Sequence, residues 1–430
     1  MTTETLPSLA ALAIAERDAS LLEKYRVTRR WTEALCEPLA TEDYVVQSMP
    51  DASPVKWHLA HTTWFFETFV LAPFVSGYQP FHPQFSVLFN SYYTAVGPRW
   101  PRAERGLLSR PTVAEVNRYR TYVDEHVTGL LESAAQSAEV EARMILGVNH
   151  EQQHQELILT DLKHAWAGNP LHPVYHVPIP DCGESPAGSW LSFAEGLAWI
   201  GHDGDGFAFD NECPRHRTFL DAFQLANRLV TNEEYLAFVA DGGYDRPELW
   251  LADGWASRQA HGWTAPLYWQ WQGTEWSAFT LGGRRPLLPA EPVCHVSYYE
   301  ADAFARWAGA RLPFEAEWET AAGSAAVAGH FLESARFHPS STPAQENSGP
   351  LFQLYGDIWQ WTGSPYLCYP GYRPPSGALG EYNAKFTCNQ FVLRGASCAT
   401  PRSHARRTYR NFFPPEARWQ FSGLRLARDA

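Results

Sequence analysis

Two histidines four residues apart are the first residues in this chain whose types and spacing could do chemistry. His150 and His154 stand in the sequence NHEQQHQE at 149–156, inside a segment at about 139–166 that has helical character. Residues four apart lie one above the other on a helix, so both imidazoles project from one face. Because imidazole nitrogens bind divalent transition metals, the pair predicts part of a metal site.

The same stretch fits the HExxH pattern of zinc metalloproteases, in which the glutamate, here Glu151, is the general base. The longer HExxHxxGxxH pattern is not met, because Leu157 replaces the glycine and Thr160 stands in place of the third histidine. His164 lies almost three helical turns beyond His154, too far to close a compact site. A third ligand must therefore come from another element.

An earlier predicted helix offers that ligand. Ser53 followed by Pro54 is a helix-start signal, with serine as the N-cap and proline at the first helical position. The helix then carries His58 and His61, which are three apart and share a face. Either of them could complete a three-histidine site in a helix bundle, and spacing alone leaves the choice open.

The motifs WHLAHTTWFFE at 57–67 and HEQQHQE at 150–156 resemble the DinB-like helical domain of the ergothioneine-type sulfoxide synthases. These are non-heme iron enzymes that join a cysteine thiol to a histidine-derived imidazole using oxygen. The resemblance implies Fe(II) held by His61, His150 and His154, with O2 as cosubstrate. It leaves His58 as a structural neighbour or as a partner of a ligand.

A site of three neutral imidazoles suits this chemistry. The imidazoles leave the 2+ charge of the iron uncompensated, which favours an anionic thiolate, and octahedral coordination leaves three positions for thiolate, imidazole and oxygen. The organisation is consistent with thiol oxygenation, although spacing alone would not identify it.

The elements that must position these residues fall into two domains, because 430 residues exceed a typical single domain. Residues 1–170 predict a four-helix bundle with a metal site in its interior. Its helices are expected at 10–35, from Ser53, from the Thr112–Glu115 capping box to about Ala135, and at 139–166, with a long connection at 74–110. The proline-rich stretch 171–189 is expected to be a linker.

From 190 to 430 the sequence indicates short strands with many Gly, Pro and Trp residues and two helical pieces, at 231–238 and 297–307. This half resembles the formylglycine-generating-enzyme-like (sulfatase-modifying-factor) domain, which has a C-type-lectin-like fold. The motifs that carry the resemblance are VTN at 230–232, PVCHVS at 292–297, RLP at 311–313, EAEWE at 315–319, GDIWQWT at 356–362 and GLRLA at 423–427. The predicted fold class is therefore α+β with two domains.

A true formylglycine-generating enzyme binds copper through two cysteines five residues apart near this end of the chain. Here Cys398 is present but position 403 is Ser403, so we do not expect that activity. Cys398 is instead expected to be a small buried hydrophobe.

The long connection contains Tyr92 and Tyr93, either core aromatics or phenols near the iron that donate a proton to reduced oxygen. The resemblance implies a catalytic tyrosine, and we expect it to be Tyr92 or Tyr93. Some branches of the family place it in the C-terminal domain, where Tyr382 could serve. The sequence leaves this choice open.

Arg99 and Arg102 match an RxxR pair that, in the resembled family, grips the carboxylate of the thiol substrate. Guanidinium groups bind carboxylates bidentately, which suits that role. Gln153, between the metal histidines, could hydrogen-bond the substrate from the side of the bundle.

The stretch RNFFP at 410–414 is expected to close over the imidazole substrate. Asn411 would bind the carboxylate of that substrate, while Phe412 and Phe413 would offer aromatic faces to its quaternary ammonium. Some relatives carry an acidic residue where Phe413 stands, so the details of recognition are open.

The predicted activity is an iron(II)- and O2-dependent coupling of cysteine or γ-glutamylcysteine to N-α-trimethylhistidine (hercynine), at a site between the two domains, as in ergothioneine biosynthesis. One alternative is an ovothiol-type synthase that uses unmethylated histidine, and another is thiol dioxygenation. A DinB-type zinc hydrolase or thiol transferase, and a non-enzymatic ligand-binding module, are the alternatives from other classes.

Composition limits the partners. The formal net charge of -13 argues against nucleic acid and anionic membranes, and there is no apolar run near 20 residues. The seven cysteines are scattered without CxxC spacing, and the N-terminus lacks a signal-peptide layout, so we expect a cytoplasmic protein with small-molecule substrates. The oligomeric state cannot be predicted.

Overall fold

Helices come first along the chain and short strands follow, as the sequence predicts. The structure, a computed structural model, describes residues 19–133, 137–177, 179, 181, 183–342, 344 and 349–430. The chain divides into two units. The first unit comprises Met1–Pro170 together with Pro375–Tyr382, and the second comprises Leu171–Pro374 and Asn383–Ala430. A short piece of the C-terminal half therefore belongs to the first unit.

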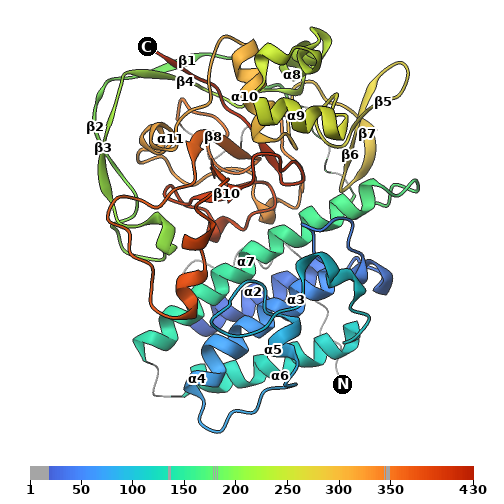
Figure 1. The fold of residues 1–430 in the computed structure, drawn as a ribbon, viewed down its shortest axis with the longest axis vertical. Coiled ribbons are helices and arrows are strands. Elements are labelled where there is room, and N and C mark those ends of the chain that lie inside the picture. Colours follow the sequence, from blue (N-terminus) through green and yellow to red (C-terminus); the bar gives the residue numbers. More distant parts are fainter. Residues whose placement is uncertain are drawn as a thin grey trace. The chain divides into compact units, whose positions relative to one another are not determined.

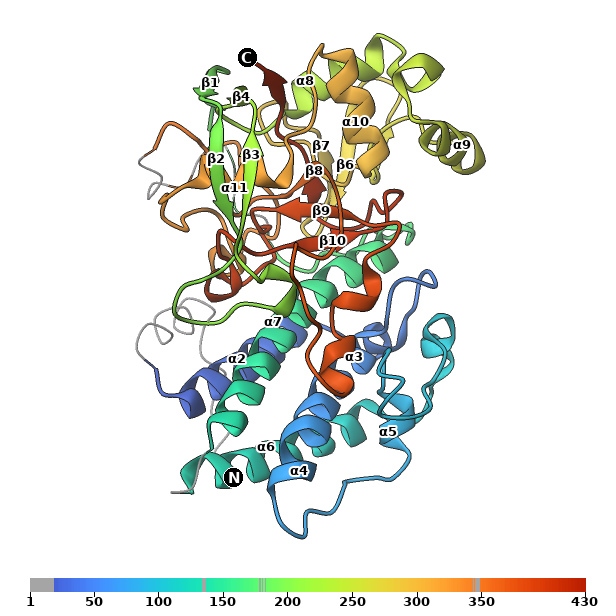
Figure 2. The same cartoon turned by 60° about the vertical axis from the view of Figure 1, so that its left-hand side comes forward.

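Four long helices build the part of the first unit that the structure describes. They are α2 (Leu21–Cys36), α3 (Val55–Phe66), α6 (Val113–Glu132) and α7 (Ala138–Ala167). Helix α2 packs against α6 and α7, and α3 packs against the same two helices; both ribbon views show the four side by side (Figures 1 and 2). Apolar residues at helical spacing, such as Val116, Val123 and Val127 of α6, are fully buried between the helices. The predicted four-helix bundle is confirmed.

The predicted helix starts were right in one case and wrong in another. Thr112 forms the predicted capping box with Glu115 at the start of α6. Ser53, however, is not an N-cap: α3 begins at Val55 with Pro54 as its N-cap residue and without a side-chain cap. The backbone N–H and the hydroxyl of Ser53 are instead engaged in tertiary hydrogen bonds. The predicted helical residues 10–18, and Ala135, lie outside the described residues.

A buried carboxylate orders the long connection that follows α3. Glu67 accepts hydrogen bonds from the hydroxyls of Tyr119 (2.6 Å) and Tyr78 (2.8 Å) and from the backbone N–H of Phe81 (3.0 Å). These contacts fix the start of the connection against α6. The short turns of the unit are η1 (Thr41–Val45), the π-turn η2 (Glu67–Leu71), α4 (Ala72–Phe74), α5 (Phe85–Leu88), η3 (Arg102–Leu107) and η8 (Ala378–Glu381).

One glycine lets α3 and α7 approach each other closely. A Cβ at Gly147 would lie 2.4 Å from Cε1 of Phe66, closer than packed atoms can be. Gly147 stands one turn before His150, so this close approach brings the histidine-bearing faces of the two helices together.

The second unit consists of short strands in four sheets. The order in its four-stranded sheet is β10-β9-β8-β11, and three smaller sheets are β1-β4-β12, β2-β3 and β5-β6-β7. The strands are β1 (Trp190–Phe193), β2 (Gly196–Ile200), β3 (His216–Leu220), β4 (Phe223–Ala226), β5 (Trp269–Trp271), β6 (Trp276–Thr280), β7 (Gly283–Pro286), β8 (Trp359–Pro365), β9 (Phe391–Arg394), β10 (Asn411–Phe413), β11 (Ser422–Gly423) and β12 (Ala427–Asp429). Trp359 and Trp361 of β8 are fully buried, which accounts for part of the heavy tryptophan content.

Helices α8 (Asn232–Ala240) and α10 (Tyr298–Trp307) correspond to the two predicted helical pieces. Each starts with a capping box, formed by Thr231 with Glu234 and by Ser297 with Glu300. Two further helices, α9 (Ala252–His261) and α11 (Glu315–Ala322), were not predicted. The remaining short turns are η4 (Asp210–Glu212), η5 (Gly243–Asp245), η6 (Pro247–Leu249), η7 (Leu332–Ser334), η9 (Ala384–Phe386) and η10 (Arg402–His404).

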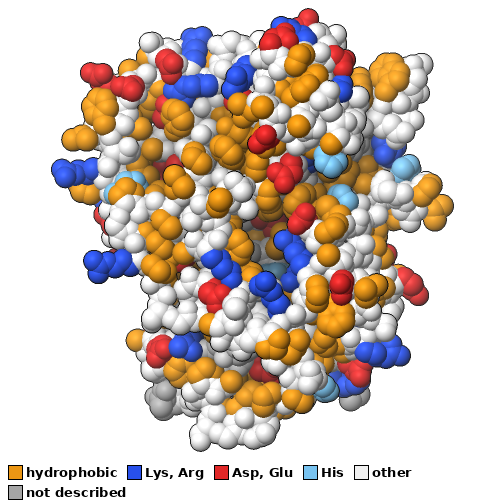
Figure 3. Space-filling view, in the orientation of Figure 1, with side chains coloured by type: hydrophobic (Ala, Val, Ile, Leu, Met, Phe, Trp, Pro, Cys, Tyr) orange, Lys and Arg blue, Asp and Glu red, His pale blue; other side chains and the backbone are white. Residues whose placement is uncertain are grey.

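On the face seen in Figure 3, basic and acidic side chains are interspersed among hydrophobic ones. Among the described helices, none combines the length and the apolar character that a membrane span requires.

Candidate metal centre

Three buried histidines from two helices converge inside the bundle. His61 of α3 and His150 and His154 of α7 each offer a ligand atom, and these atoms lie within 4.8 Å of one another. The Nε2 atoms of His61 and His150 are 3.2 Å apart. The structure thus brings together the three residues that the sequence predicts as metal ligands.

The surroundings of these imidazoles favour their neutral, metal-binding form. Burial lowers the pKa of His150 to about 3 and lowers the pKa values of His61 and His154 well below their usual range. The Nδ1–H of His61 donates to the carbonyl oxygen of Phe89 at 2.6 Å, which leaves a lone pair on Nε2. When both Nε2 atoms are unprotonated, their lone pairs repel one another unless a cation lies between them, so the residues present fit a divalent metal.

Aromatic rings hold the histidines in place and keep water away from them. The ring of Trp57 stacks on His61 with centroids 4.5 Å apart and planes 12° apart. Trp64 stacks on His61 as well, at 5.4 Å, and Phe65 lies 4.5 Å from His150. All three aromatic residues are buried, so the rings of the histidines have little freedom to rotate.

Glu151, the glutamate of the HExxH pattern, is not available as a general base. Its Oε2 accepts from Nη1 of Arg29 at 2.8 Å, and its Oε1 accepts from the Thr32 hydroxyl at 2.7 Å and from Nη2 of Arg120 at 3.3 Å. Burial opposes ionisation, but the two guanidinium groups outweigh it and lower the pKa of Glu151 to about 2. A carboxylate that is held by Arg29 and Arg120, and whose pKa is this low, is too weak a base for the general-base role, so the metalloprotease interpretation fails.

A chain of tyrosine rings reaches the histidines from the segment Pro375–Tyr382. The hydroxyl of Tyr382 donates to Oε1 of Gln153 at 2.5 Å, and the Tyr382 ring lies edge-on to His150 with centroids 5.8 Å apart. The Tyr92 ring is 6.5 Å from Tyr382, and Tyr93 stacks on Tyr92 at 4.6 Å. The ring of Tyr382 therefore contacts a histidine of the cluster directly.

Two backbone contacts hold that segment against the long connection. The carboxylate of Glu381 accepts from the N–H groups of Thr94 (3.0 Å) and Ala95 (2.8 Å), which follow the tyrosine pair directly. The segment and the connection therefore present their tyrosines together.

The arginines of the connection differ in exposure. Arg99 is exposed, and Arg102 is exposed while it contacts the backbone carbonyl and the carboxylate of Asp51. Arg105, which was not predicted, is only 5% exposed, and its guanidinium carbon lies 3.3 Å from the ring centroid of Trp57. Since Trp57 stacks on His61, Arg105 is the arginine that belongs to the histidine cluster. A signal existed, because Arg102 and Arg105 repeat the RxxR spacing of Arg99 and Arg102.

The predicted substrate residues of the second unit lie on β10. Oδ1 of Asn411 accepts from the N–H of Phe412 at 2.9 Å. The Phe412 ring stacks on Tyr366 with centroids 4.0 Å apart and planes 13° apart, and Phe413 meets Trp419 edge-on at 5.8 Å. The β10 side chains are half-buried, so their aromatic faces are partly accessible.

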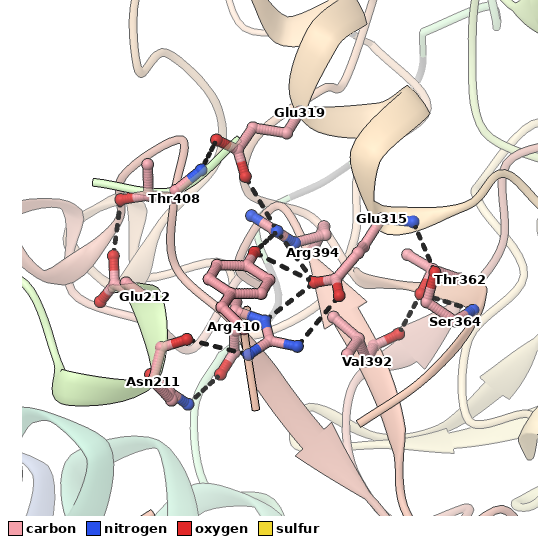
Figure 4. A network of polar contacts seen from close by, with 12 residues as sticks. Asn211, Glu212, Glu315, Glu319, Thr362, Ser364, Val392, Arg394, Thr408 and Arg410 are labelled. Atoms are coloured by element: carbon pink, nitrogen blue, oxygen red, sulfur yellow. Dashed lines mark hydrogen bonds and ion pairs between the residues drawn. The ribbon is translucent and has the colours of Figure 1, made fainter. Parts of the chain in front are cut away.

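A buried ionic network anchors the residue just before β10 (Figure 4). Arg410 donates to both carboxylate oxygens of Glu315 at 2.9 Å and to the backbone oxygen of Asn211 at 2.8 Å. Arg394 joins the network by donating to Glu315 and to Glu319, at 3.0 Å each. Burial opposes ionisation of Glu315, yet the two arginines keep the pKa of its carboxyl below its usual value. The network fixes the position of β10.

Comparison with known proteins agrees with this architecture. Residues 24–164 match the model of the DinB superfamily, and residues 184–430 match that of the sulfatase-modifying factor enzyme 1-like domain. The resemblance of each half to its predicted domain is thereby confirmed, and with it the predicted fold class.

Named relatives match over half or more of the chain. The chain is 36% identical to the hercynine oxygenase of Mycolicibacterium smegmatis over 67% of this chain and 72% of that protein. It is 33% identical to the hercynine oxygenase of Mycolicibacterium thermoresistibile over 88% of each chain. The formylglycine-generating enzyme of Streptomyces coelicolor is 28% identical over 53% of this chain and 84% of that enzyme. The chain belongs to the hercynine oxygenase family.

Proposed function

We propose that this enzyme is a non-heme iron(II)- and O2-dependent sulfoxide synthase that couples cysteine or γ-glutamylcysteine to hercynine. The observation that carries the proposal is the buried cluster of His61, His150 and His154, found in a chain that is homologous to hercynine oxygenases. The ligand set contains neutral imidazoles and no carboxylate, which suits a substrate that brings its own negative charge as a thiolate.

The reaction balances with O2 as the sole oxidant. A C–H bond of the imidazole and the S–H bond of the thiol are lost, a C–S bond and an S=O bond form, and the second oxygen atom leaves as water. Iron bound at the three histidines would supply the redox chemistry of O2 activation. The protein must then position two substrates and deliver protons.

Proton delivery is the role we assign to the tyrosine chain. Tyr382 lies beside His150, and its hydroxyl is held by Gln153, so we assign it as the proton donor to reduced oxygen. Tyr92 and Tyr93, which we expected to act directly, stand behind Tyr382 in the same chain of rings. We propose that they orient its ring.

Carboxylate binding is the role we assign to the arginines. Arg99 and Arg102 are exposed, and Arg105 is buried against Trp57. A cation held next to His61 suits the carboxylate of a thiol substrate whose sulfur binds at the histidines. For the imidazole substrate we propose Asn411 as a carboxylate partner and Phe412 and Phe413 as aromatic faces for the trimethylammonium group.

The alternatives make different predictions. An ovothiol-type synthase would accept histidine in place of hercynine. A zinc hydrolase or thiol transferase would need zinc and would work without oxygen; the engagement of Glu151 by Arg29 and Arg120 already removes its general base. The sulfoxide synthase is the alternative that uses both iron and O2 to join two substrates.

The experiment compares metals and substrates. The metal-free enzyme is loaded anaerobically with Fe(II) or Zn(II), mixed with hercynine and cysteine, and exposed to air while O2 uptake and product mass are recorded. We expect the coupled sulfoxide with iron alone, and its loss in His61→Ala, His150→Ala and His154→Ala. His126→Ala is the matched control, because His126 lies on α6 and bonds to the backbone oxygen of Tyr122 in its own helix. Activity with zinc in the absence of oxygen would reject the proposal.

We also expect the enzyme to act in the cytoplasm. Among the described cysteines, Cys36, Cys213, Cys368 and Cys388 form no disulfide bond, as is usual in a reducing compartment.

A further inference from the structure

A line of hydrogen bonds leads from Asp161 through His58 to His154. Nε2 of His58 lies 3.0 Å from Oδ2 of Asp161, and Nδ1 of His58 lies 2.8 Å from Nδ1 of His154. All three side chains are buried, with exposed fractions of 5%, 2% and 9% respectively. Buried polar groups are costly unless they are satisfied, so the order of protons along this line is well defined.

The order of protons follows from what each atom can do. A carboxylate only accepts hydrogen bonds, so Nε2 of His58 carries a hydrogen and donates to Asp161. In its neutral form His58 then has a lone pair at Nδ1, which accepts the Nδ1–H of His154. His154 therefore presents the lone pair of its Nε2, which is the form that a metal ligand needs.

Asp161 is itself fixed by Ser53, which lies just before the helix that carries His58. The backbone N–H of Ser53 donates to the same Oδ2 at 2.8 Å, and the Ser53 hydroxyl accepts from Nη1 of Arg105 at 2.9 Å. This engagement explains why Ser53 does not cap α3. The hydrogen bond from Ser53 also holds the residues just before α3 against Asp161 of α7.

The three histidines of the cluster differ in what holds their far nitrogen. His61 donates to the carbonyl of Phe89, and among the described residues Nδ1 of His150 has no hydrogen-bond partner. Among the described residues, His154 is the one histidine of the cluster that is linked to a carboxylate in this way, through His58. A carboxylate behind a ligating imidazole fixes its tautomer and raises its basicity.

We propose that Asp161 and His58 are positioning residues that fix the tautomer and ring orientation of His154 and strengthen it as a metal ligand. The proposal rests on the proposed metal site and deepens it. It gives a role to both histidines of α3. His61 binds the metal, and His58 fixes the tautomer and orientation of His154.

The first test measures metal affinity in three variants. His58→Phe removes the acceptor for His154, His58→Gln retains an amide oxygen that can accept, and Asp161→Asn retains an acceptor but removes the charge. We expect Co(II) affinity, from competition with a chelator, to fall about 10–100-fold in His58→Phe, in line with the loss of an outer partner of a metal ligand. His58→Gln should recover most of that loss, and Asp161→Asn should fall between them.

Glu67→Gln is the control, because Glu67 is an equally buried carboxylate of the same unit whose partners are Tyr78, Tyr119 and Phe81. Its Co(II) affinity should match that of the wild type, even where its melting temperature falls as much as that of His58→Phe. Equal losses of affinity in His58→Phe and His58→Gln, or in His58→Phe and the control, would overturn the proposal.

The second test needs no metal, so it separates this proposal from the proposed function. In the metal-free protein labelled with 15N-histidine, magic-angle-spinning NMR reports which nitrogen of each ring is protonated. We expect His154 to carry its proton on Nδ1 in the wild type and in His58→Gln, and to lose this preference in His58→Phe. A wild-type His154 protonated on Nε2 would overturn the proposal, whether or not the protein binds iron.

Discussion

Arg29 of α2 donates to Glu151 of α7 at 2.8 Å, directly beside the metal-site residue His150. The side chain of Arg29 is 4% exposed and that of Glu151 is 0% exposed, so the ion pair is fully inside the bundle. The glutamate that a motif search would assign to catalysis therefore connects two helices.

We predict that Glu151→Gln lowers stability much more than it lowers catalysis. Breaking a buried ion pair costs about 3–5 kcal/mol, because the partner charge is left uncompensated. The turnover number of the folded, iron-loaded variant should fall less than about tenfold, whereas loss of a general base costs about 100–10,000-fold. Urea unfolding and steady-state kinetics measure both quantities.

Glu132→Gln is the control for this prediction, since Glu132 forms an exposed ion pair with Arg26 and should change stability by less than about 1 kcal/mol. A Glu151→Gln protein of wild-type stability with a collapsed turnover number would restore the general-base interpretation.

The tyrosines make a second prediction. Tyr382→Phe should shift the products from the coupled sulfoxide towards oxidised thiol, because the proposed proton donor, whose ring contacts His150, is lost. Tyr92→Phe and Tyr93→Phe remove hydroxyl groups that lie beyond Tyr382 in the series of tyrosine rings, so they should shift the product ratio less. Mass spectrometry of the product mixture gives the ratio. If Tyr93→Phe had the largest effect, proton delivery would belong to the tyrosine pair.

Our third prediction concerns substrate binding by arginine. Changing Arg99, Arg102 or Arg105 to Gln should raise the Michaelis constant of the thiol substrate more than that of hercynine. Loss of a charge-assisted hydrogen bond of about 1.5–3 kcal/mol corresponds to roughly a 10–100-fold rise. Arg118→Gln, an exposed change on α6, should leave both constants unchanged. Equal increases for the two substrates would reject the assignment.

A fourth prediction concerns pH and the second unit. Burial, aided by Arg406, holds the pKa of His404 well below its usual 6.5, and Nε2 of His404 lies 2.9 Å from the hydroxyl of Tyr409. As pH falls below about 6.5, the unfolded chain takes up a proton at this position and the folded protein does not. Because of His404, the free energy of unfolding therefore decreases as pH falls, by up to about 1.4 kcal/mol per pH unit.

His404→Gln should reduce this slope. The free energy of unfolding is measured from pH 7.5 to pH 5. It should change less steeply with pH in the variant than in the wild type, by the slope that corresponds to the uptake of about one proton on unfolding. An unchanged slope would mean that His404 is protonated in the folded protein.

The sequence predicted what depends on local pattern. The capping box at Thr112 gave the start of α6, because the cap and its glutamate are only three positions apart. His150 and His154 could be paired because both lie on one helix. The prediction that Ser53 caps α3 was wrong because its hydrogen-bond partners, Asp161 and Arg105, are distant in sequence. These tertiary contacts outweighed a local capping signal.

The features that the sequence did not predict depend on contacts between distant segments. Arg105 belongs to the site because its guanidinium group lies against the ring of Trp57. Tyr382 belongs to it because this residue contacts Gln153 and His150. The family resemblance named Tyr382 as a candidate, yet nothing in its neighbouring residues indicates that this short segment joins the helical unit.

The measurement that tests the central claim most directly is the fate of 18O2. The iron-loaded enzyme is supplied with hercynine, cysteine and 18O2, and the products are analysed by mass spectrometry. The account predicts a single coupled product that contains a C–S bond and one 18O atom in its sulfoxide, with the other 18O atom in water. A coupled product without 18O, or 18O found only in oxidised cysteine with hercynine unchanged, would contradict it.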